Sequence, residues 1–228
     1  GLDECKLFDP TALPRFGQVP PVHRGAWLDQ QVLAWLGKAH VEWPRRRSTP
    51  ARPLDPIQDV QVLVGVHDGP LGVQAVNRYL KAILNPVKPG EAVVRIGGRE
   101  GYDCTVGDKV IQGENDYPRA VMNGMVGRVV AIKAQPSGER GVLVQYEERE
   151  HPVEYATRRE LNQLELAFAY TVHRSQGSEY AITLVPVHET YGPLLNKTLI
   201  YTAWTRAKQA VGVFGDRRLL ERGIQRND

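Results

Sequence analysis

The chain has 228 residues, of which 42% are hydrophobic and 24% charged, as is ordinary for a globular protein with one substantial core and a smaller domain. Its formal net charge of +3 permits nucleic-acid binding without arguing for it, because a binding groove needs local rather than global charge. No apolar run approaches the roughly 18 residues of a membrane span, and Cys5 and Cys104 lack partners at metal-ligand spacing, which argues against a zinc site or a disulfide framework and for a reducing, cytoplasmic setting.

The N-terminal segment, residues 1–55, is interrupted by prolines and carries no domain assignment. One helix is predicted within it, at Ala26–Lys38, because Trp27, Leu33 and further apolar residues are interspersed with polar ones. The arginine run at 45–47 is predicted to lie in a proline-rich loop, where a solvated linker is favoured over a phosphate-binding patch.

A strand, a turn and a helix are predicted next. Residues 60–66 read VQVLVGV, a short β-branched run that is typical of a strand covered on both faces in a parallel sheet. Gly69-Pro70 ends this strand. Apolar residues at helical spacing then predict a helix from Val73 to Ile83, which Asn85-Pro86 ends.

The pattern changes after Gly107, where short strands alternate with turn signals such as Asn123-Gly124. Strands predicted at 108–112, 126–132, 142–146 and 153–155 favour a small antiparallel barrel. From residue 164 onwards the α/β pattern returns. It predicts a core strand at 181–187, a helix at about 193–208 and a strand at 210–214. The predicted fold class is therefore α/β, with a β-barrel inserted in a parallel-sheet domain.

The polar segment 171–179 precedes a core strand, so we expect it at the carboxyl edge of the sheet, where ligands bind in open α/β folds. The hydroxyl of Thr171 can cap the turn, and Gly177 permits a positive φ or the close approach of a ligand. Gln176 offers a donor and an acceptor, and Glu179 suits a ribose hydroxyl. Neutral donors that suit a phosphodiester backbone are those of Thr171, His173 and Ser175. The alternative is a capped surface turn.

The predicted helix at 193–208 carries a candidate phosphate-binding cation, Arg206. Leu199, Ala203 and Ala207 are spaced four residues apart and form its core stripe, and Arg206 lies on a neighbouring face. A guanidinium on a rigid element can stabilise charge on a transferring γ-phosphoryl group. The alternative is a surface ion pair, worth about 0–1 kcal/mol.

Two of these segments resemble helicase motifs. AYTVHRSQGSE, at 169–179, resembles the fifth motif of RecD-like superfamily 1 DNA helicases, the exodeoxyribonuclease V alpha subunit family. YTAWTRAK, at 201–208, resembles their sixth motif at the expected distance. The resemblance implies that Thr171 and His173 lie along single-stranded DNA, with Ser175 as a further candidate. The implied nucleotide contacts are Gln176, Gly177, Glu179 and Arg206, with Arg206 as the catalytic contact to the γ-phosphate.

Two further stretches resemble the same family. Residues 60–77 are similar to the fourth motif and its helix, but Asp68 stands where the family places Arg or Lys, and His67 is a conceivable substitute. Residues 106–130 are similar to the stretch that begins an SH3-like barrel, in which Asn115 and Asp116 are predicted to brace a turn rather than touch DNA. The implied domains are a RecA-like second motor domain at 56–104 and 164–228 and an SH3-like barrel at 105–163.

The sequence contains no G-x-x-x-x-G-K-[ST] phosphate loop and no Mg²⁺-binding acidic motif of the helicase set. We therefore expect this chain to be the carboxyl-terminal part of a longer helicase. Its first residue, Gly1 instead of Met, favours the same interpretation. The resemblance implies that the whole protein uses ATP with Mg²⁺, moves 5′→3′ on single-stranded DNA and serves recombination or repair. Expected partners are DNA, the missing motor domain and nuclease or helicase subunits, and the chain alone is expected to be inactive.

Two alternatives remain open at this point. One is the helicase part of a conjugative relaxase, against which the run at 201–208 argues, because those proteins usually diverge after the fifth motif. The other is a degenerate module that binds DNA or a partner without hydrolysing ATP, which Asp68 and the missing phosphate loop favour.

Overall fold

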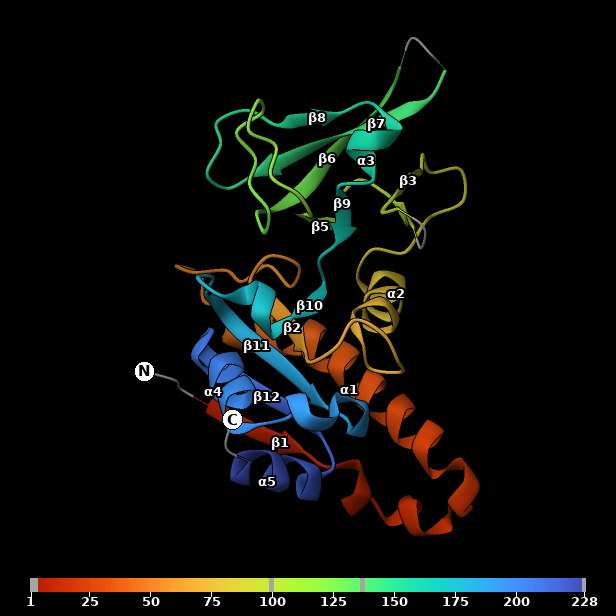
Figure 1. Cartoon of the computed structure of the whole chain (residues 1–228), viewed down its shortest axis with the longest axis vertical. Helices are drawn as coiled ribbons and strands as arrows, with labels where there is room; N and C mark the ends of the chain where they lie inside the picture. The colour runs from red at the N-terminus through yellow and green to blue at the C-terminus, as the bar shows by residue number, and fades with distance from the viewer. Residues whose placement is uncertain (1–3, 99–100, 136–137, 227–228) are drawn as a thin grey trace. The chain divides into compact units, whose positions relative to one another are not determined.

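The computed structural model describes residues 4–98, 101–135 and 138–226, and the chain divides into two compact units. Unit 1 comprises residues 1–79 and 169–228, and unit 2 comprises residues 80–168. A parallel five-stranded sheet lies in unit 1, and a separate antiparallel five-stranded sheet lies in unit 2 (Figure 1). The predicted α/β fold class is thereby confirmed. The domain boundaries and the SH3-like identity of residues 105–163 stay predictions.

The parallel sheet has the strand order β1-β12-β11-β2-β10. Residues of β2 and nearly all of β11 are buried, which explains why both strands are continuously apolar rather than alternating. Every neighbouring pair runs parallel, so the carboxyl ends of all five strands lie at one edge. The strands are β1 (Glu4–Phe8), β2 (Val60–Val64), β10 (Ala169–Thr171), β11 (Tyr180–Val187) and β12 (Ala207–Gly215).

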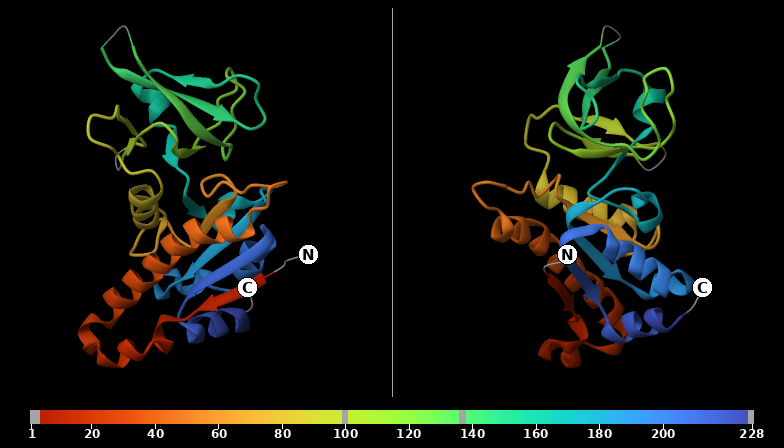
Figure 2. Two further views of the ribbon diagram at one scale, coloured as in Figure 1. Left: turned by 180° about the vertical axis from the view of Figure 1, so that it is seen from behind. Right: turned by 90° about the vertical axis from the view of Figure 1, so that its left-hand side faces the viewer.

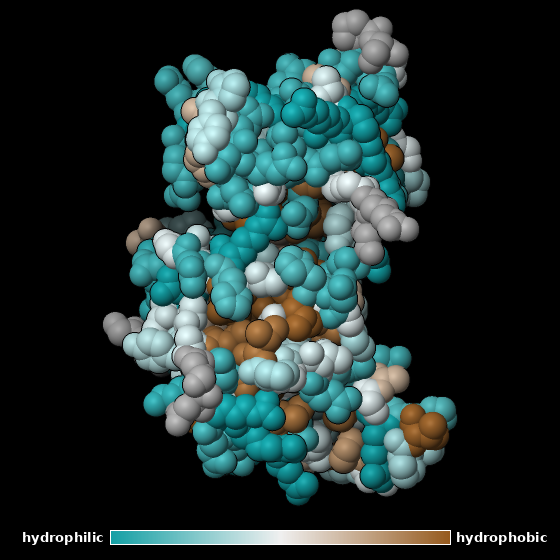
Figure 3. All heavy atoms as spheres, viewed as in Figure 1, coloured by the Kyte–Doolittle hydropathy of each residue, from teal (hydrophilic) through white to brown (hydrophobic). Residues whose placement is uncertain are grey.

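Helices cover both faces of this sheet (Figure 2). The long helix α1 (Arg24–Arg47) packs against β11 and β12 on one face. On the other face lie α4 (Lys197–Thr205), α5 (Arg217–Gln225) and the 3₁₀ turn η4 (Val172–Ser175), with α4 in contact with both α5 and η4. Further 3₁₀ turns are η1 (Pro10–Ala12), η2 (Pro14–Gln18), η3 (Pro21–His23) and η5 (Glu189–Leu194). On the side shown in Figure 3, apolar residues gather over the middle of the parallel sheet.

The prediction for the N-terminal segment was too short at the helix and wrong at the arginine run. Helix α1 continues through Pro44, and residues 45–47 form its last turn instead of a loop. The guanidinium of Arg46 lies 2.7 Å from Glu42, one turn earlier, and that of Arg47 lies 4.9 Å from the ring centroid of Trp43. Arg46 and Arg47 thus have interaction partners within their own helix.

Strand β1 escaped prediction because it is an edge strand with a polar sequence, ECKLF. Its last residue, Phe8, stacks on Phe214 of β12 at 4.8 Å between ring centroids. The ring of Phe8 also lies beside those of Trp35 and Trp43 of α1, with centroid distances of 5.8 and 6.0 Å. This aromatic cluster packs the N-terminal segment onto the parallel sheet.

Helix α2 (Val73–Leu84) leads from unit 1 towards unit 2, and β10 is the first strand after the chain returns. The buried side chain of Asn77 joins the two. Its Nδ2 donates to the oxygen of Ala169 at 2.7 Å, and its Oδ1 accepts from the amide of Ala169 at 2.9 Å. Because β10 is the outermost strand, this amide side chain takes the place of a neighbouring strand.

Unit 2 is built on an antiparallel sheet of strand order β8-β7-β6-β5-β9. Helix α3 (Arg158–Leu161) precedes β9 and begins with a capping box between Thr157 and Glu160. A two-stranded sheet, β3 (Val94–Ile96) and β4 (Tyr102–Cys104), lies outside the larger one. The main strands are β5 (Lys109–Gln112), β6 (Val126–Ala134), β7 (Arg140–Tyr146), β8 (Val153–Tyr155) and β9 (Leu164–Leu166).

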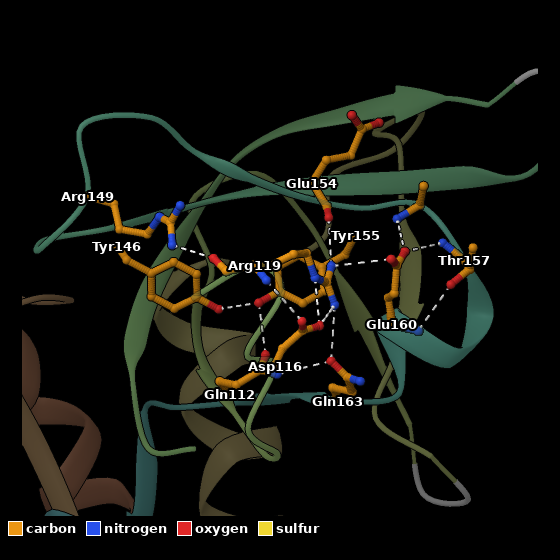
Figure 4. Close-up of polar contacts among 11 residues, drawn as sticks. Gln112, Asp116, Arg119, Tyr146, Arg149, Glu154, Tyr155, Thr157, Glu160 and Gln163 are labelled. Carbon is orange, nitrogen blue, oxygen red and sulfur yellow. Dashed lines mark hydrogen bonds and ion pairs between the residues drawn. The ribbon is translucent and has the colours of Figure 1, made fainter. Parts of the chain in front are cut away.

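The loop between β5 and β6 is held by a polar network (Figure 4). Asp116 and Val121 exchange two backbone hydrogen bonds, and the carboxylate of Asp116 binds the guanidinium of Arg119. That guanidinium also donates to the backbone oxygen of Glu154 at 2.9 Å and lies 4.6 Å from the ring centroid of Tyr155. The prediction that Asp116 braces a turn is confirmed.

No helix in the described ranges is both long enough and apolar enough to span a membrane.

Candidate functional site

The segment that joins β10 to β11 begins and ends at opposite edges of the parallel sheet. Thr171 ends β10 and pairs with Val64, the last residue of β2. Tyr180 begins β11 and pairs with Ala207, the first residue of β12. Val62 of β2 pairs with Ala169 of β10 on one side and with Leu184 of β11 on the other. Thr171 therefore lies at the level of the carboxyl-terminal part of β11. Thr171 thus ends its strand at the carboxyl edge of the sheet, whereas Tyr180 begins its strand at the amino edge.

The expectation that the whole segment 171–179 lies at the carboxyl edge is therefore wrong for its second half. Only Thr171 ends a strand there, and the chain crosses the sheet face as η4 before it reaches Tyr180. The predicted DNA contact Thr171 lies at the carboxyl edge. The predicted nucleotide contacts Glu179 and Arg206 directly precede β11 and β12 at the amino edge.

The three candidate DNA contacts differ in exposure. His173 is exposed, whereas Thr171 and Ser175 are buried. The Ser175 hydroxyl donates to the oxygen of Val172 at 2.6 Å and so closes η4. Thr171 occupies the N-cap position of η4, but its side chain makes no capping bond, contrary to the prediction. The imidazole of His173 is thus the most accessible donor of the three.

The candidate nucleotide contacts of the fifth motif are all exposed. Gly177 has φ +88°, a conformation that residues with a Cβ seldom adopt, and open space surrounds it. Gln176 is exposed as well. The carboxylate of Glu179 lies 3.1 Å from the ammonium of Lys208, and both side chains are more than half exposed. An ion pair this exposed contributes at most about 1 kcal/mol and leaves Glu179 accessible.

Arg206 does not lie on a helix, contrary to the prediction. Helix α4 begins after its N-cap Asn196 and ends at Thr205, and Ala207 already belongs to β12. The backbone oxygen of Arg206 accepts from the amide of Tyr180 at 2.8 Å. The core stripe of the helix therefore ends at Ala203, and Arg206 is held between a helix and a strand instead.

The guanidinium of Arg206 has only weak partners. Its Nη1 donates to the oxygen of Ser178 at 3.4 Å, and its Nη2 donates to the hydroxyl of Thr205 at 3.2 Å. Its Nε is buried and has no hydrogen-bond partner among the described residues. Long bonds and an unmatched buried donor leave this cation with capacity for an anionic ligand. Ser178 was not a predicted site residue, since a backbone acceptor has no sequence signal.

The fourth-motif residues lie away from Arg206. His67 and Asp68 are exposed and follow the carboxyl end of β2, whereas Arg206 precedes the amino end of β12. The backbone oxygen of His67 accepts from Gln74 at the start of α2. The structure does not bring Asp68 or His67 together with the predicted nucleotide contacts.

A cavity of about 500 Å³ opens beyond the carboxyl ends of β11 and β12, and none of the predicted site residues line it. His188 and Asp29 meet in it, with Nε2 of His188 2.9 Å from Oδ1 of Asp29. Its lining carries two arginines, Arg222 and Arg226, as well as the carboxylates of Asp29, Glu189 and Asp216. No cluster of three or more metal-binding side chains occurs within the ranges that the structure describes.

Comparisons with known proteins find relatives of this chain among DNA helicases. Residues 166–214 match the model of the UvrD-like helicase C-terminal domain. The chain is 42% identical to the ATP-dependent RecD2 DNA helicase of Deinococcus radiodurans over 149 residues, which is 65% of this chain and 19% of that protein. It is 32% identical to the RecBCD enzyme subunit RecD of Mycobacterium tuberculosis, covering 75% of this chain and 27% of that subunit.

A structural likeness was found to a Pif1 helicase from Bacteroides in complex with ADP-AlF3 and single-stranded DNA. The TM-score is 0.47 and the identity 15%, over 88% of this chain and 49% of that one. The chain spans less than a third of the length of the two curated relatives.

Proposed function

We propose a function for this chain from its family, since it is homologous to the RecD2 and RecD helicases over most of its length and is part of a RecD-like DNA helicase. In our proposal it forms the carboxyl-terminal, RecA-like motor domain, with residues 105–163 as an SH3-like insertion. The whole protein couples ATP hydrolysis to movement on single-stranded DNA, 5′→3′ by family resemblance, in recombination or repair. It works in the cell interior, with nuclease or helicase subunits as further partners.

The DNA track in this proposal runs past the carboxyl end of β10. His173 offers an exposed neutral donor there, and Thr171 ends the strand immediately before it. Neutral donors bind phosphate oxygens without base preference, as a protein that moves along DNA requires. Ser175 acts beside them by fixing η4, because its hydroxyl is used within the turn.

In this proposal, the nucleotide binds at the amino ends of β11 and β12. Arg206 contacts the γ-phosphate, where a fixed guanidinium stabilises the charge that develops during phosphoryl transfer. Gln176, Gly177 and Glu179 lie on the nucleotide side, with Glu179 as acceptor for a ribose hydroxyl. The phosphate loop and the Mg²⁺ ligands belong to the other motor domain of the whole protein. Bound ATP with Mg²⁺ supplies the phosphoryl group that is transferred to water.

One observation carries the proposal. A single short segment connects the predicted DNA contact, at one edge of the sheet, to the predicted nucleotide contacts, at the other. A motor needs such a link, because DNA binding and ATP hydrolysis must influence each other.

Binding of a fluorescent thymidine oligonucleotide by this chain, measured across a salt series, tests the proposal. We expect binding that weakens with salt and is strongly reduced in the double variant Thr171→Ala/His173→Ala. Absence of binding at low salt, or equal binding by the double variant, would sink the DNA assignment. The same preparation should show negligible ATPase activity, and substantial turnover would contradict the assignment of the phosphate loop to another domain.

A second candidate function is a module that binds DNA or a partner subunit without taking part in hydrolysis. The exposed Asp68 favours it, because a carboxylate stands where the family places a cation, so the fourth motif offers no positive charge to a phosphate there. The reading frame upstream of Gly1 decides between the two. A phosphate loop encoded there supports the helicase, and a start codon directly before Gly1 supports the binding module.

A further inference from the structure

Two tyrosines close the segment that carries the proposed contacts. The hydroxyl of Tyr170, in β10, and the hydroxyl of Tyr180, in β11, are hydrogen-bonded to each other. Their rings meet edge to face, with centroids 6.4 Å apart and an interplanar angle of 65°. Tyr170 is only 2% exposed. Phenylalanine would fill the same space without a polar group to satisfy, so the hydroxyl pair is a specific feature and not a packing requirement.

The pair stands between the two proposed contact regions. Tyr170 directly precedes Thr171, at the DNA end of the segment. Tyr180 directly follows Glu179, and its amide donates to the backbone oxygen of Arg206 at 2.8 Å. Burial raises the pKa of the Tyr180 hydroxyl, and the positive charge of Arg206 opposes that rise. The two side chains thus bridge the distance that separates DNA contact from nucleotide contact.

The backbone that connects the two regions directly, between Thr171 and Tyr180, is less tightly packed than the tyrosine pair. Residues 176 and 177 are exposed, and no atom beyond the adjacent residues lies within 4 Å of the position that a Cβ would take on Gly177. A glycine at positive φ in open space can change its backbone angles with few steric consequences. A displacement of β10 would be absorbed at Gly177 along the chain, whereas the packed tyrosines would carry it to Tyr180.

We propose that Tyr170 and Tyr180 are positioning residues that transmit DNA contact at the end of β10 to Arg206. The inference rests on the proposed function, because it assigns a partner to each end of the segment. DNA bound beside Thr171 fixes the end of β10 and hence the Tyr170 hydroxyl. The hydroxyl pair fixes Tyr180, and the amide of Tyr180 holds the backbone of Arg206 in place.

NMR-detected amide hydrogen exchange in this chain tests the transmission, with a thymidine oligonucleotide of about 15 nucleotides as the DNA probe. In the unsubstituted chain, we expect the oligonucleotide to slow exchange in η4 and also, at least about fivefold, at the Tyr180 amide. In Tyr170→Phe and in Tyr180→Phe, slowing in η4 persists and slowing at Tyr180 is lost. The double variant shows no larger effect than either single one, because each removes the same bond.

Tyr191→Phe is the matched control. Tyr191 is a buried tyrosine of the same unit, and its hydroxyl donates to the oxygen of Leu71 at 3.0 Å. Its loss removes a comparable bond without touching the pair, so exchange at Tyr180 should stay as it is in the unsubstituted chain. Equal slowing at Tyr180 in Tyr170→Phe, or additive effects of the two substitutions, would overturn the inference.

Failure of the proposed function gives a different result. If the oligonucleotide does not slow amide exchange in η4 of the unsubstituted chain, the DNA assignment fails. The role of the tyrosine pair is then tested by amide exchange measured without DNA. Tyr170→Phe alone should speed exchange of the Tyr180 amide about fivefold, the effect of one hydrogen bond, while amides of β1 keep their rates. An unchanged rate at Tyr180 overturns the transmission.

Discussion

The backbone oxygen of Arg206 accepts a hydrogen bond of 2.8 Å from the amide of Tyr180, which ties the start of β12 to the start of β11. Backbone groups therefore hold this residue in place, whereas its guanidinium makes only long hydrogen bonds. The charge of Arg206 can consequently be removed without loss of the bond that positions it.

If the proposed function holds, replacement of this charge should slow ATP hydrolysis by the whole protein and leave folding intact. In the whole protein, we expect Arg206→Ala to lower kcat for ATP hydrolysis roughly a thousandfold, the lower end of the effect of an arginine finger. The melting temperature should change little, because the side chain is half-buried and weakly bonded. Steady-state ATPase assays and thermal melts on one preparation measure both. Lys208→Ala is the control, since it removes a nearby cation whose ion pair is exposed. Equal loss of activity in both variants would argue against a specific role for Arg206.

Loss of the neutral donors should weaken DNA binding equally at every salt concentration. We expect Thr171→Val and His173→Ala each to reduce affinity for single-stranded DNA about tenfold, the effect of a hydrogen bond to a charged group. The slope of log affinity against log salt should not change, because a neutral side chain releases no counterion. Fluorescence anisotropy at several salt concentrations measures both quantities. His151→Ala, an exposed histidine of unit 2, is the control. A shallower slope in His173→Ala would show that its imidazole binds as a cation.

The buried ion pair of unit 2 should dominate the stability of that unit. Nζ of Lys81 lies 2.8 Å from the carboxylate of Asp108, whose side chain is fully buried. Lys81→Met leaves this carboxylate without its cation, so we expect a loss of about 3–5 kcal/mol in the free energy of unfolding. Chemical denaturation measures the change. Arg95→Met, which removes the exposed pair with Asp103, should cost at most about 1 kcal/mol. Similar losses in the two variants would contradict this account.

The loop between β5 and β6 should lose its structure in acid. The side-chain hydrogen bond from Arg119 holds the pKa of Asp116 below its ordinary value. The carboxylate stabilises the folded loop fully above the unfolded pKa of about 3.9, and this contribution is lost as the pH falls through the lower, folded value. NMR signals of residues 116–121 should therefore persist at pH 4 and change below it. Arg119→Gln should move that change to higher pH. A transition above pH 4 in the unsubstituted chain would contradict the prediction.

Much of the fold could be predicted from sequence where a strand is buried on both faces. The runs at 60–64 and 180–187 are continuously apolar because helices cover both sides of the sheet, so their pattern is local and unambiguous. Strand β1 could not be found in this way. Its residues alternate little and face solvent at the sheet edge, and its pairing with β12 is specified by Phe8 and the aromatic cluster far along the chain.

The candidate site was predicted as a set of residues but not as a geometry. The motifs proposed Glu179 and Arg206 as nucleotide contacts, which stay predictions. Helical spacing placed Arg206 on α4, whereas pairing of Ala207 with Tyr180 ends the helix and begins β12. Tertiary pairing overrode a helical pattern that was locally sound. Likewise, the separation of Thr171 from Glu179 depends on the register of three strands, which no local pattern contains.

The bond between Asn77 and Ala169 joins residues 92 positions apart and has a consequence for the order of folding. A disordered loop of that length pays an entropic cost for bringing its ends together. If unit 2 folds first, its compact body holds the chain on either side close, and the remaining closure is short. Strand β10 can then dock beside β2 with its outer edge already satisfied by an amide. In a chain synthesised from its N-terminus, the parallel sheet is thus completed last, by the strands next to the proposed DNA and nucleotide contacts.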